Sequence, residues 1–235
     1  MPVPELILKK RRAIQRDARS AAERATAREE RAKFVREHAI KSAQKYAKEY
    51  HEAELAEKRA REQALAAGRI HVPEEARIYL VIRIRGIVGV APKPRTILAL
   101  FRLRQINNAV FIRCNTATLG ALRLIDPYVT YGEPSLETVR ALVYKRGFAS
   151  VGGMRVPIVD NELIDEHLGE HGLLCAEDVV HELYTCGPHF GEASRFLWPF
   201  KLSPPKLRSK ANAFTEGGDF GYRGSYINSF VADMI

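Results

Sequence analysis

The sequence predicts an α+β fold, in which a β-α-β-α-β core carries a long N-terminal α-helix and an additional helical C-terminal part. Residues 5–67 contain no Gly and no Pro, and the helix formers Ala, Glu, Lys and Arg dominate them. Between residues 78 and 132, three short β-branched or aromatic segments alternate with two helical patterns. We expect these helices to stack on one face of a small antiparallel sheet.

The first expected unit is a basic helical extension, residues 1–70, with 18 Lys and Arg against 11 Asp and Glu. At about 1.5 Å per residue, a single helix over 5–67 extends about 95 Å, so most of it would project from a globular domain. A seam with a 3.5-residue period passes through Val35, Ala39 and Tyr46, but it is mostly Ala and too thin to drive a coiled coil alone.

We therefore interpret the extension as a charged helix that lies on nucleic acid, with a coiled-coil adaptor through residues 5–67 as an alternative. The first four cations also match a short nuclear import signal. The candidate RNA-binding residues of the extension are Lys9, Lys10, Arg11, Arg12 and Arg16.

The expected core covers residues 71–133. Its first strand, 78–86, places Arg83 and Arg85 on one face and Ile82 and Ile84 on the other. The remaining elements are a helix opened by residues 92–96, a strand at 109–113, a helix from about 116 to 125 and a strand at 128–132.

Two further units follow the core. Residues 134–190 are a helical addition, with helices expected at 135–146, at 161–168 after an Asp160 N-cap, and after Glu177. Residues 157–190 hold 8 Asp and Glu and no Lys or Arg, so we expect this acidic segment to face away from any polyanion. Residues 191–235 form a tail rich in Gly, Pro and aromatics.

The overall charge favours a polyanion as partner, because the net charge is +9 and the pI about 9.6. No apolar run approaches the roughly 20 residues that a membrane span requires, and we expect no secretory signal peptide, because the N-terminus leads directly into charged residues. Three Cys without a C-x-x-C pair indicate neither a disulfide framework nor a thiolate zinc site, and favour a reduced compartment.

A glycine-containing loop before Lys93 resembles a phosphate cradle, but it lacks the G-x-x-x-x-G-K-[ST] spacing of a nucleotide P-loop. Free N–H groups at a helix N-terminus still attract phosphate, and Lys93 and Arg95 add charge there. Arg102, seven residues past Arg95, is expected on nearly the same helix face, and Asn107 could reach bases or sugars. The alternative is a solvated basic face.

Residues 144–148 form a second cluster of basic and aromatic residues, Tyr-Lys-Arg-Gly-Phe. Lys145 and Arg146 are suited to pair with phosphates, and Phe148 could stack on a splayed base or belong to the core.

The stretch "HLGEH" matches the H-x-x-E-H pattern of zinc metalloproteases, with His167 and His171 as ligands and Glu170 as base. Such a site requires both imidazoles on one uninterrupted helix face. Gly169 should end the helix, so we do not expect metal binding. A zinc-dependent hydrolase is kept as an alternative function.

Several blocks together make a specific pattern: "PKPRTILALFRLRQINNAVFIRCNTATLGALRLIDPYVTYGEPS", "VYKRGF", "RVPIVDN", "GPHFGEASRFLWPFKLSPP" and "EGGDFG". From about Arg77 to Ile235 the chain resembles eukaryotic large-subunit ribosomal proteins of the universal L30 family, the L7 type. The resemblance implies a ferredoxin-like core that binds large-subunit ribosomal RNA near the 5S RNA, with the N-terminal helix along an RNA expansion segment. It implies a structural constituent of the subunit, with no catalysis, cofactor or metal.

The resemblance also implies site residues, partners and location. Carried over by residue, the RNA contacts are Lys93, Arg95, Arg102, Arg104, Asn107, Lys145 and Arg146; the basic-aromatic pattern adds Arg113, Phe148, Arg155 and Lys201. By charge, the acidic segment should face solvent or a basic neighbouring ribosomal protein. No membrane is expected as partner, and the location is the cytoplasmic ribosome, with nuclear or nucleolar passage during assembly.

Overall fold

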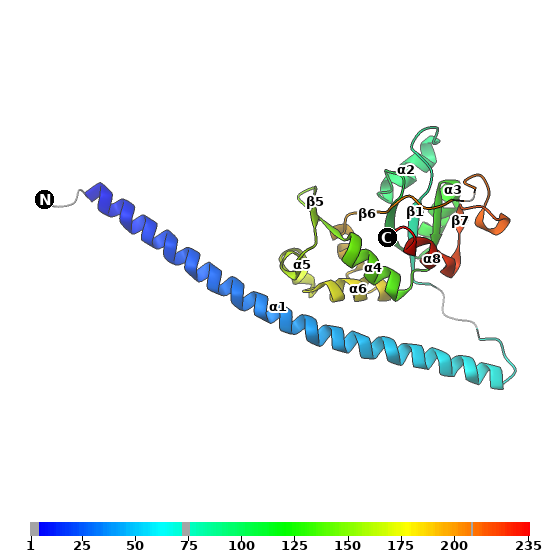
Figure 1. Cartoon of the computed structure of the whole chain (residues 1–235), viewed down its shortest axis with the longest axis horizontal. Helices are drawn as coiled ribbons and strands as arrows, with labels where there is room; N and C mark the ends of the chain where they lie inside the picture. The colour runs from blue at the N-terminus through cyan, green and yellow to red at the C-terminus, as the bar shows by residue number, and fades with distance from the viewer. Residues whose placement is uncertain (1–4, 72–75, 208) are drawn as a thin grey trace.

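A long helix and a globular part make up the computed structural model, which describes residues 5–71, 76–207 and 209–235, with side chains from residue 22 onward. Helix α1 spans Glu5–Ala66, which confirms the predicted N-terminal helix. It runs beneath the globular part and extends far beyond it at its N-terminal end (Figure 1). Its middle packs against the helices α5 (Asn161–Leu168) and α6 (Ala176–Thr185), a contact that the sequence did not indicate.

The predicted β-α-β-α-β order is confirmed. The elements that form it are β1 (Ile78–Arg83), α2 (Pro92–Leu100), β2 (Asn108–Arg113), α3 (Thr116–Ile125) and β3 (Val129–Gly132). Strand β1 lies between β2 and β3 and is antiparallel to both. The side chain of Asn115 caps α3 by accepting from the backbone of Thr118 at 3.0 Å, which fixes where this helix starts.

The remaining part adds helices and four short strands. These are α4 (Leu136–Arg146), β4 (Phe148–Val151), β5 (Met154–Pro157), α5, α6, α7 (Phe190–Phe196), β6 (Phe200–Lys201), β7 (Gly221–Tyr222) and α8 (Ile227–Ala232). Strands β6 and β7 extend the sheet to the order β6-β2-β1-β3-β7, and β4 and β5 form a separate hairpin. The sequence predicted none of these four strands, because each has only two to four residues.

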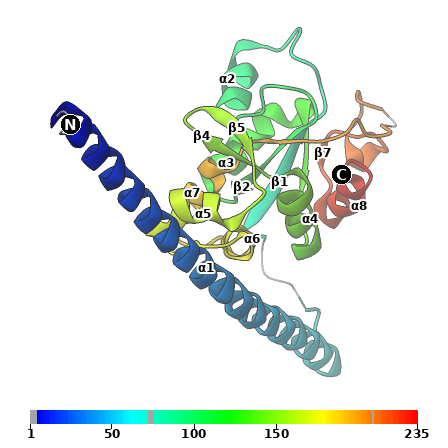
Figure 2. The same ribbon diagram turned by 60° about the vertical axis from the view of Figure 1, so that its left-hand side comes forward.

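The two core helices lie on one face of the sheet, as expected, and the helices of the later part cover the other face (Figure 2). Val81, Val110 and Ile112 pack with α2 and α3 on one face. Leu80 and Phe111 point to the opposite face and pack with α4 to α8. Successive side chains of a strand alternate between faces, and β1 and β2 are apolar on both, which requires two covering layers.

Arg83 lies on the strand face opposite Ile82 and Ile84, as predicted, but its side chain is buried there, only 4% exposed. Its guanidinium donates to the carbonyl oxygens of Arg85, Gly86 and Leu103 at 2.7–2.8 Å. Burial lowers the pKa of this guanidinium from its ordinary value. Arg83 therefore organises the turn after β1, because most of its donor groups bond to main-chain oxygens there.

Candidate nucleic-acid interface

A basic groove of about 540 Å³ lies where the core meets the hairpin and the segment after α7. The core contributes Arg102, Arg104, Gln105 and Asn108, while the hairpin and the later segment contribute the rest of the lining. The complete lining is Arg102, Arg104, Gln105, Asn108, Ser150, Arg155, Trp198, Pro199 and Lys201. The lining contains four cations and no carboxylate, which suits an anionic partner.

Short strand pairings bring these distant segments together. Strand β6 pairs antiparallel with β2, which sets Lys201 opposite Asn108. The backbone N–H of Trp198 donates to the carbonyl oxygen of Phe148 at 2.7 Å, which joins β6 to the hairpin. Because β6 has only two residues, the placement of Lys201 in the same groove as Arg104 could not be predicted from the sequence.

Three of the predicted cations meet in this groove. The side chains of Arg104 and Lys201 are exposed and make no hydrogen bond or ion pair with any residue that the structure describes. Arg155 is also exposed, and its guanidinium carbon lies 3.6 Å from the centroid of the Phe148 ring. Arg155 thus covers one face of the ring that we expected to stack on a base.

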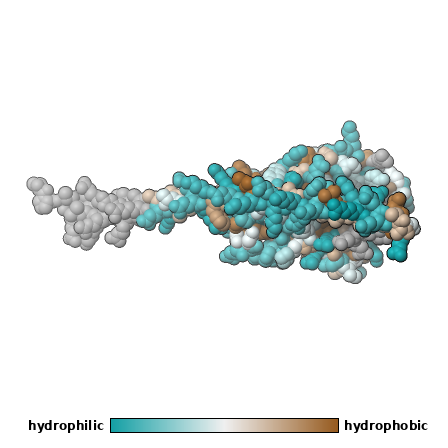
Figure 3. Space-filling model, turned by 90° about the horizontal axis from the view of Figure 1, so that it is seen from below, coloured by the Kyte–Doolittle hydropathy of each residue, from teal (hydrophilic) through white to brown (hydrophobic). Residues whose placement is uncertain are grey.

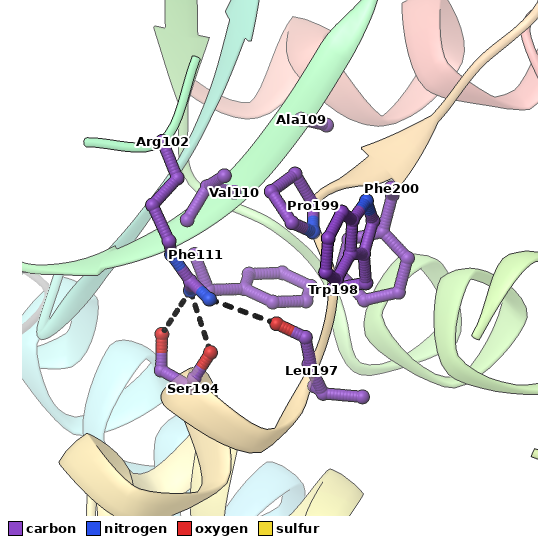
Figure 4. A pocket seen from close by; sticks show the side chains of 9 residues that line it. All are labelled: Arg102, Ala109, Val110, Phe111, Ser194, Leu197, Trp198, Pro199 and Phe200. Atoms are coloured by element: carbon purple, nitrogen blue, oxygen red, sulfur yellow. Dashed lines mark hydrogen bonds between the residues drawn. The ribbon is translucent and has the colours of Figure 1, made fainter. Parts of the chain in front are cut away.

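Arg102 also lines the groove, but its predicted place on the same helix face as Arg95 is wrong. Helix α2 ends at Leu100, and Arg102 has a φ of 60°, which turns its side chain away from the helix axis. Its guanidinium donates to the carbonyl oxygens of Ser194 and Leu197, at 2.6 and 2.9 Å (Figure 4). Arg102 therefore fastens the segment after α7 to the core.

The N-terminus of α2 carries Lys93 and Arg95, both exposed as expected. The phosphate cradle predicted there is weaker than the sequence suggested, because Pro92 and Pro94 occupy the first turn and have no N–H to donate. The N–H of Arg95 is engaged with the carbonyl oxygen of Ala91 at 3.0 Å. What this end of the helix offers a phosphate is mainly side-chain charge.

The other predicted RNA contacts differ in how exposed their side chains are and in whether hydrogen bonds within the chain already use them. Lys145 and Arg113 are exposed, and Asn107 is half-buried in a left-handed conformation with a φ of 61°. Arg146 is half-buried and donates to the Ser203 hydroxyl at 3.0 Å and to the main-chain oxygen of Ile235 at 2.7 Å. The side chains of Lys9, Lys10, Arg11, Arg12 and Arg16 lie outside the described residues.

The acidic segment is in contact with the chain's own basic helix, which corrects the expectation that it faces only solvent or a neighbouring protein. Arg28 of α1 pairs with Glu162, and Arg31 pairs with Asp165, each through two guanidinium nitrogens. These hydrogen bonds lower the pKa of both carboxyl groups. The segment still turns away from a polyanion, but a part of its charge is neutralised internally.

Aromatic contacts continue this interface along α1. The Tyr46 hydroxyl donates to the buried carboxylate of Asp178 at 2.9 Å, and the Tyr46 ring stacks on His181 with centroids 4.0 Å apart. Val35 is 4% exposed, so the apolar seam faces this domain. The outward face of α1 is predominantly hydrophilic (Figure 3). The coiled-coil alternative is therefore not supported.

The H-x-x-E-H stretch does not form the predicted rival site. Helix α5 ends at Leu168, and a 3₁₀ helix over Gly169–His171 follows, so the two histidines do not share one α-helical face. The His167 ring lies 6.0 Å from that of Phe196, whereas the His171 ring lies 5.0 Å from that of His189. The zinc-hydrolase alternative is not supported.

His38, Cys175 and Asp178 are the one group of possible metal ligands gathered closely within the described ranges. Asp178 already accepts hydrogen bonds from the backbone N–H groups of Leu174 and Cys175, at 3.0 and 3.1 Å. Burial raises the pKa of the Cys175 thiol to about 12, which keeps it protonated. This cluster is a helix cap at the α1–α6 contact.

None of the helices that the structure describes combines the length and the apolar character that a membrane span requires.

Two family models match the chain. One, described as ribosomal protein L30p/L7e, matches residues 79–129, and the other, the ribosomal L30 N-terminal domain, matches residues 3–74. These stretches correspond to the β1-α2-β2-α3 region and to α1.

Curated relatives match over nearly the whole length. The large ribosomal subunit protein uL30 of Yarrowia lipolytica is 47% identical over 234 residues, covering 97% of this chain and 93% of the relative. The uL30 protein of Dictyostelium discoideum is 43% identical, covering 99% and 96%. That of Drosophila melanogaster is 50% identical over 196 residues, covering 82% and 78%. The similarity thus includes the long helix, the core and the C-terminal part.

Proposed function

Because this chain belongs to the ribosomal protein L30p/L7e family, we propose that its basic groove and the exposed cations around it are the contact surface for ribosomal RNA. The chain is a structural, non-enzymatic constituent of the large ribosomal subunit, located on the cytoplasmic ribosome. A structural protein of this class orders RNA by neutralising phosphates and by matching its shape.

The groove carries the proposal, because Arg104, Arg155 and Lys201 meet there without a carboxylate in the lining. Exposed cations with free donor groups gain most from phosphate, since neither their hydrogen bonds nor their charge is already used. Lys93, Arg95 and Lys145 add exposed cations on α2 and α4. Arg102 and Arg146 are left out of the proposed contacts, because their donors already serve main-chain oxygens.

The division of charge supports the same assignment. Carboxylates of the acidic segment pair with Arg28 and Arg31 of α1, which reduces the repulsion that they would exert on RNA. Asp160 and Glu170 remain exposed, and we propose that they face a basic neighbouring ribosomal protein. RNA then meets the chain at the groove and at the free parts of α1.

Helix α1 is proposed to lie along an RNA expansion segment through the part that precedes Arg28. This part includes the five cations predicted from sequence, Lys9, Lys10, Arg11, Arg12 and Arg16. The contact of α1 with α5 and α6 fixes the direction in which that basic end extends from the core (Figure 1). We also propose that the core lies near the 5S RNA and that assembly includes nuclear or nucleolar passage.

The test measures how the affinity of the full chain for RNA changes with salt concentration. Titrations with large-subunit RNA fragments, including 5S RNA, should show affinity that falls steeply between about 50 and 200 mM salt. A variant with Lys93→Ala, Arg95→Ala and Arg104→Ala should bind more weakly and with a smaller salt slope. Crosslinking on the assembled subunit then identifies the RNA at each position.

A matched control removes a cation from the acidic side. Arg140 pairs with Glu177 at 3.0 Å, so Arg140→Ala lowers the net charge without removing a proposed RNA contact. We expect its RNA affinity to remain near that of the unmodified chain. RNA affinity that does not change with salt would count against this surface as the RNA contact. So would an Arg140→Ala control that loses as much RNA affinity per charge removed as the triple variant does.

A further inference from the structure

We infer that the basic groove holds one unstacked nucleotide of the bound RNA, with its base against Trp198 and its phosphate at Arg104 and Lys201. This inference rests on the proposed function, since it requires that the groove faces RNA. It goes further by naming what enters the groove: a single flipped-out or bulged nucleotide rather than the backbone of a paired helix.

The first support is the combination of an aromatic side chain with exposed cations. Trp198 is half-buried, lines the groove, and has no ring partner among the described residues. The hydrogen bond from its backbone N–H to the carbonyl oxygen of Phe148 positions this segment of the chain at the groove. An aromatic ring beside exposed cations is the arrangement by which proteins stack unpaired bases and neutralise their phosphates.

The second support is an unpartnered polar group in the lining. Asn108 lines the groove, and its side-chain amide makes no hydrogen bond with any residue that the structure describes. The amide is open to the groove, so it can pair with a ligand that supplies both a donor and an acceptor. The edge of a nucleobase supplies both, whereas a phosphate alone would satisfy only the N–H groups.

The position of the groove, in a recess between three parts of the chain, also favours an unpaired nucleotide as its ligand. Its walls come from the start of β2, from the β4–β5 hairpin and from the segment after α7, so it is a recess between elements and not a flat basic face. A paired A-form helix presents its backbone and shallow groove, and cannot place a single base into such a recess without unpairing it. An unpaired nucleotide can enter it.

The sequence contains one Trp, so intrinsic fluorescence reports directly on the groove. The test titrates the full chain with two RNA hairpins of the same stem, one with a single-nucleotide bulge and one fully paired. We expect the bulged RNA to quench Trp198 and to bind tighter by on the order of tenfold, as stacking of one base provides. The paired RNA should bind without comparable quenching.

Two variants separate the groove from the rest of the surface. Arg104→Ala keeps the fluorophore and, because its side chain is exposed, should remain folded while losing most of the preference for the bulge. Trp198→Leu should abolish the preference and leave paired-RNA binding in place, with circular dichroism as the check on folding. Lys93→Ala, outside the groove, should weaken binding to both RNAs and keep their ratio.

The outcomes are distinct. Salt-dependent binding of both hairpins with equal affinity and no quenching overturns this inference and leaves the proposed function standing. No binding of any large-subunit RNA overturns both. Quenching by an acidic peptide such as oligoglutamate, equal to that by bulged RNA, would show that the groove takes carboxylates and would also overturn the inference.

Discussion

Arg31 of α1 forms a two-point ion pair with Asp165 of α5, in which Nε donates to Oδ2 at 2.8 Å and Nη2 donates to Oδ1 at 2.6 Å. Such fork-to-fork pairs fix orientation as well as distance, because both partners are planar. Arg28, one turn earlier on α1, pairs with Glu162 in the same way. The direction of the long helix relative to the core is thus set by two pairs and by the aromatic contacts that follow them.

The first prediction concerns this pairing. Arg31→Asp should loosen the docked part of α1, because it places two carboxylates where one ion pair was. Amide hydrogen exchange over residues 31–50 should become faster, while the core strands keep their protection. The double variant Arg31→Asp with Asp165→Arg should restore protection. If the double variant is as loose as the single one, the pair does not orient the helix.

The second prediction concerns the buried cap of α6. Asp178 is 2% exposed and accepts from two backbone N–H groups and from the Tyr46 hydroxyl. Asp178→Ala leaves these donors without a partner and should lower the free energy of unfolding by about 2–4 kcal/mol in urea titrations. Tyr46→Phe removes one of the three bonds and should cost only about 0.5–1.5 kcal/mol.

The third prediction is a pH dependence at the same interface. Burial lowers the pKa of His181 below its ordinary value of about 6.5, and Lys45 acts in the same direction, against Glu49, Glu182 and Asp178. The neutral imidazole is therefore favoured in the docked state. Protonation favours the detached state, so docking of α1 should weaken as the pH falls below about 6.5 and should be unaffected above about 7.5.

Hydrogen exchange over residues 40–50, corrected for the intrinsic pH dependence, measures this effect. The imidazole of His38 lies nearby, with its Nδ1 3.6 Å from the carboxylate of Asp178. His181→Phe keeps a ring to stack on Tyr46 but does not titrate, so the weakening at low pH should disappear. A weakening that persists in this variant would assign the effect to other groups.

Secondary structure in this chain follows from local sequence to a large extent. The Gly- and Pro-free run predicted α1 to within a residue at its C-terminal end, and the Asn115 and Ser135 caps set the starts of α3 and α4. The rule that Gly169 should interrupt α5 also held, since a 3₁₀ helix begins there. These features depend on neighbours within about four residues, which a single sequence displays.

The roles of individual cations could not be predicted in the same way. Arg102 and Arg104 are two residues apart and chemically identical, but the first donates to the backbone near Ser194, some ninety residues away, while the second is free. The partner of the acidic segment was also missed, because the pairs with α1 join residues 134 positions apart. The run of carboxylates in the acidic segment predicts a basic partner. Only the fold shows that this partner includes Arg28 and Arg31 of α1.

The fourth prediction tests this difference between neighbouring arginines. Arg104→Ala should leave the free energy of unfolding within about 0.5 kcal/mol of the unmodified chain, since its exposed side chain makes no hydrogen bond or ion pair with any residue that the structure describes. Its RNA affinity should fall, and the slope of log affinity against log salt should decrease by about 1, as expected for one lost phosphate contact.

Arg102→Met should behave in the opposite way. It removes the donors to the carbonyl oxygens of Ser194 and Leu197 and should lower the free energy of unfolding by about 2–3 kcal/mol. Where the variant is still folded, its salt slope should be nearly unchanged, because no phosphate contact is lost. Urea unfolding and salt-dependent RNA titration on the same two proteins measure both quantities. A reduced slope for Arg102→Met, with unaltered stability, would mean that the original sequence-based assignment of Arg102 to RNA was right and that its internal hydrogen bonds give way when RNA binds.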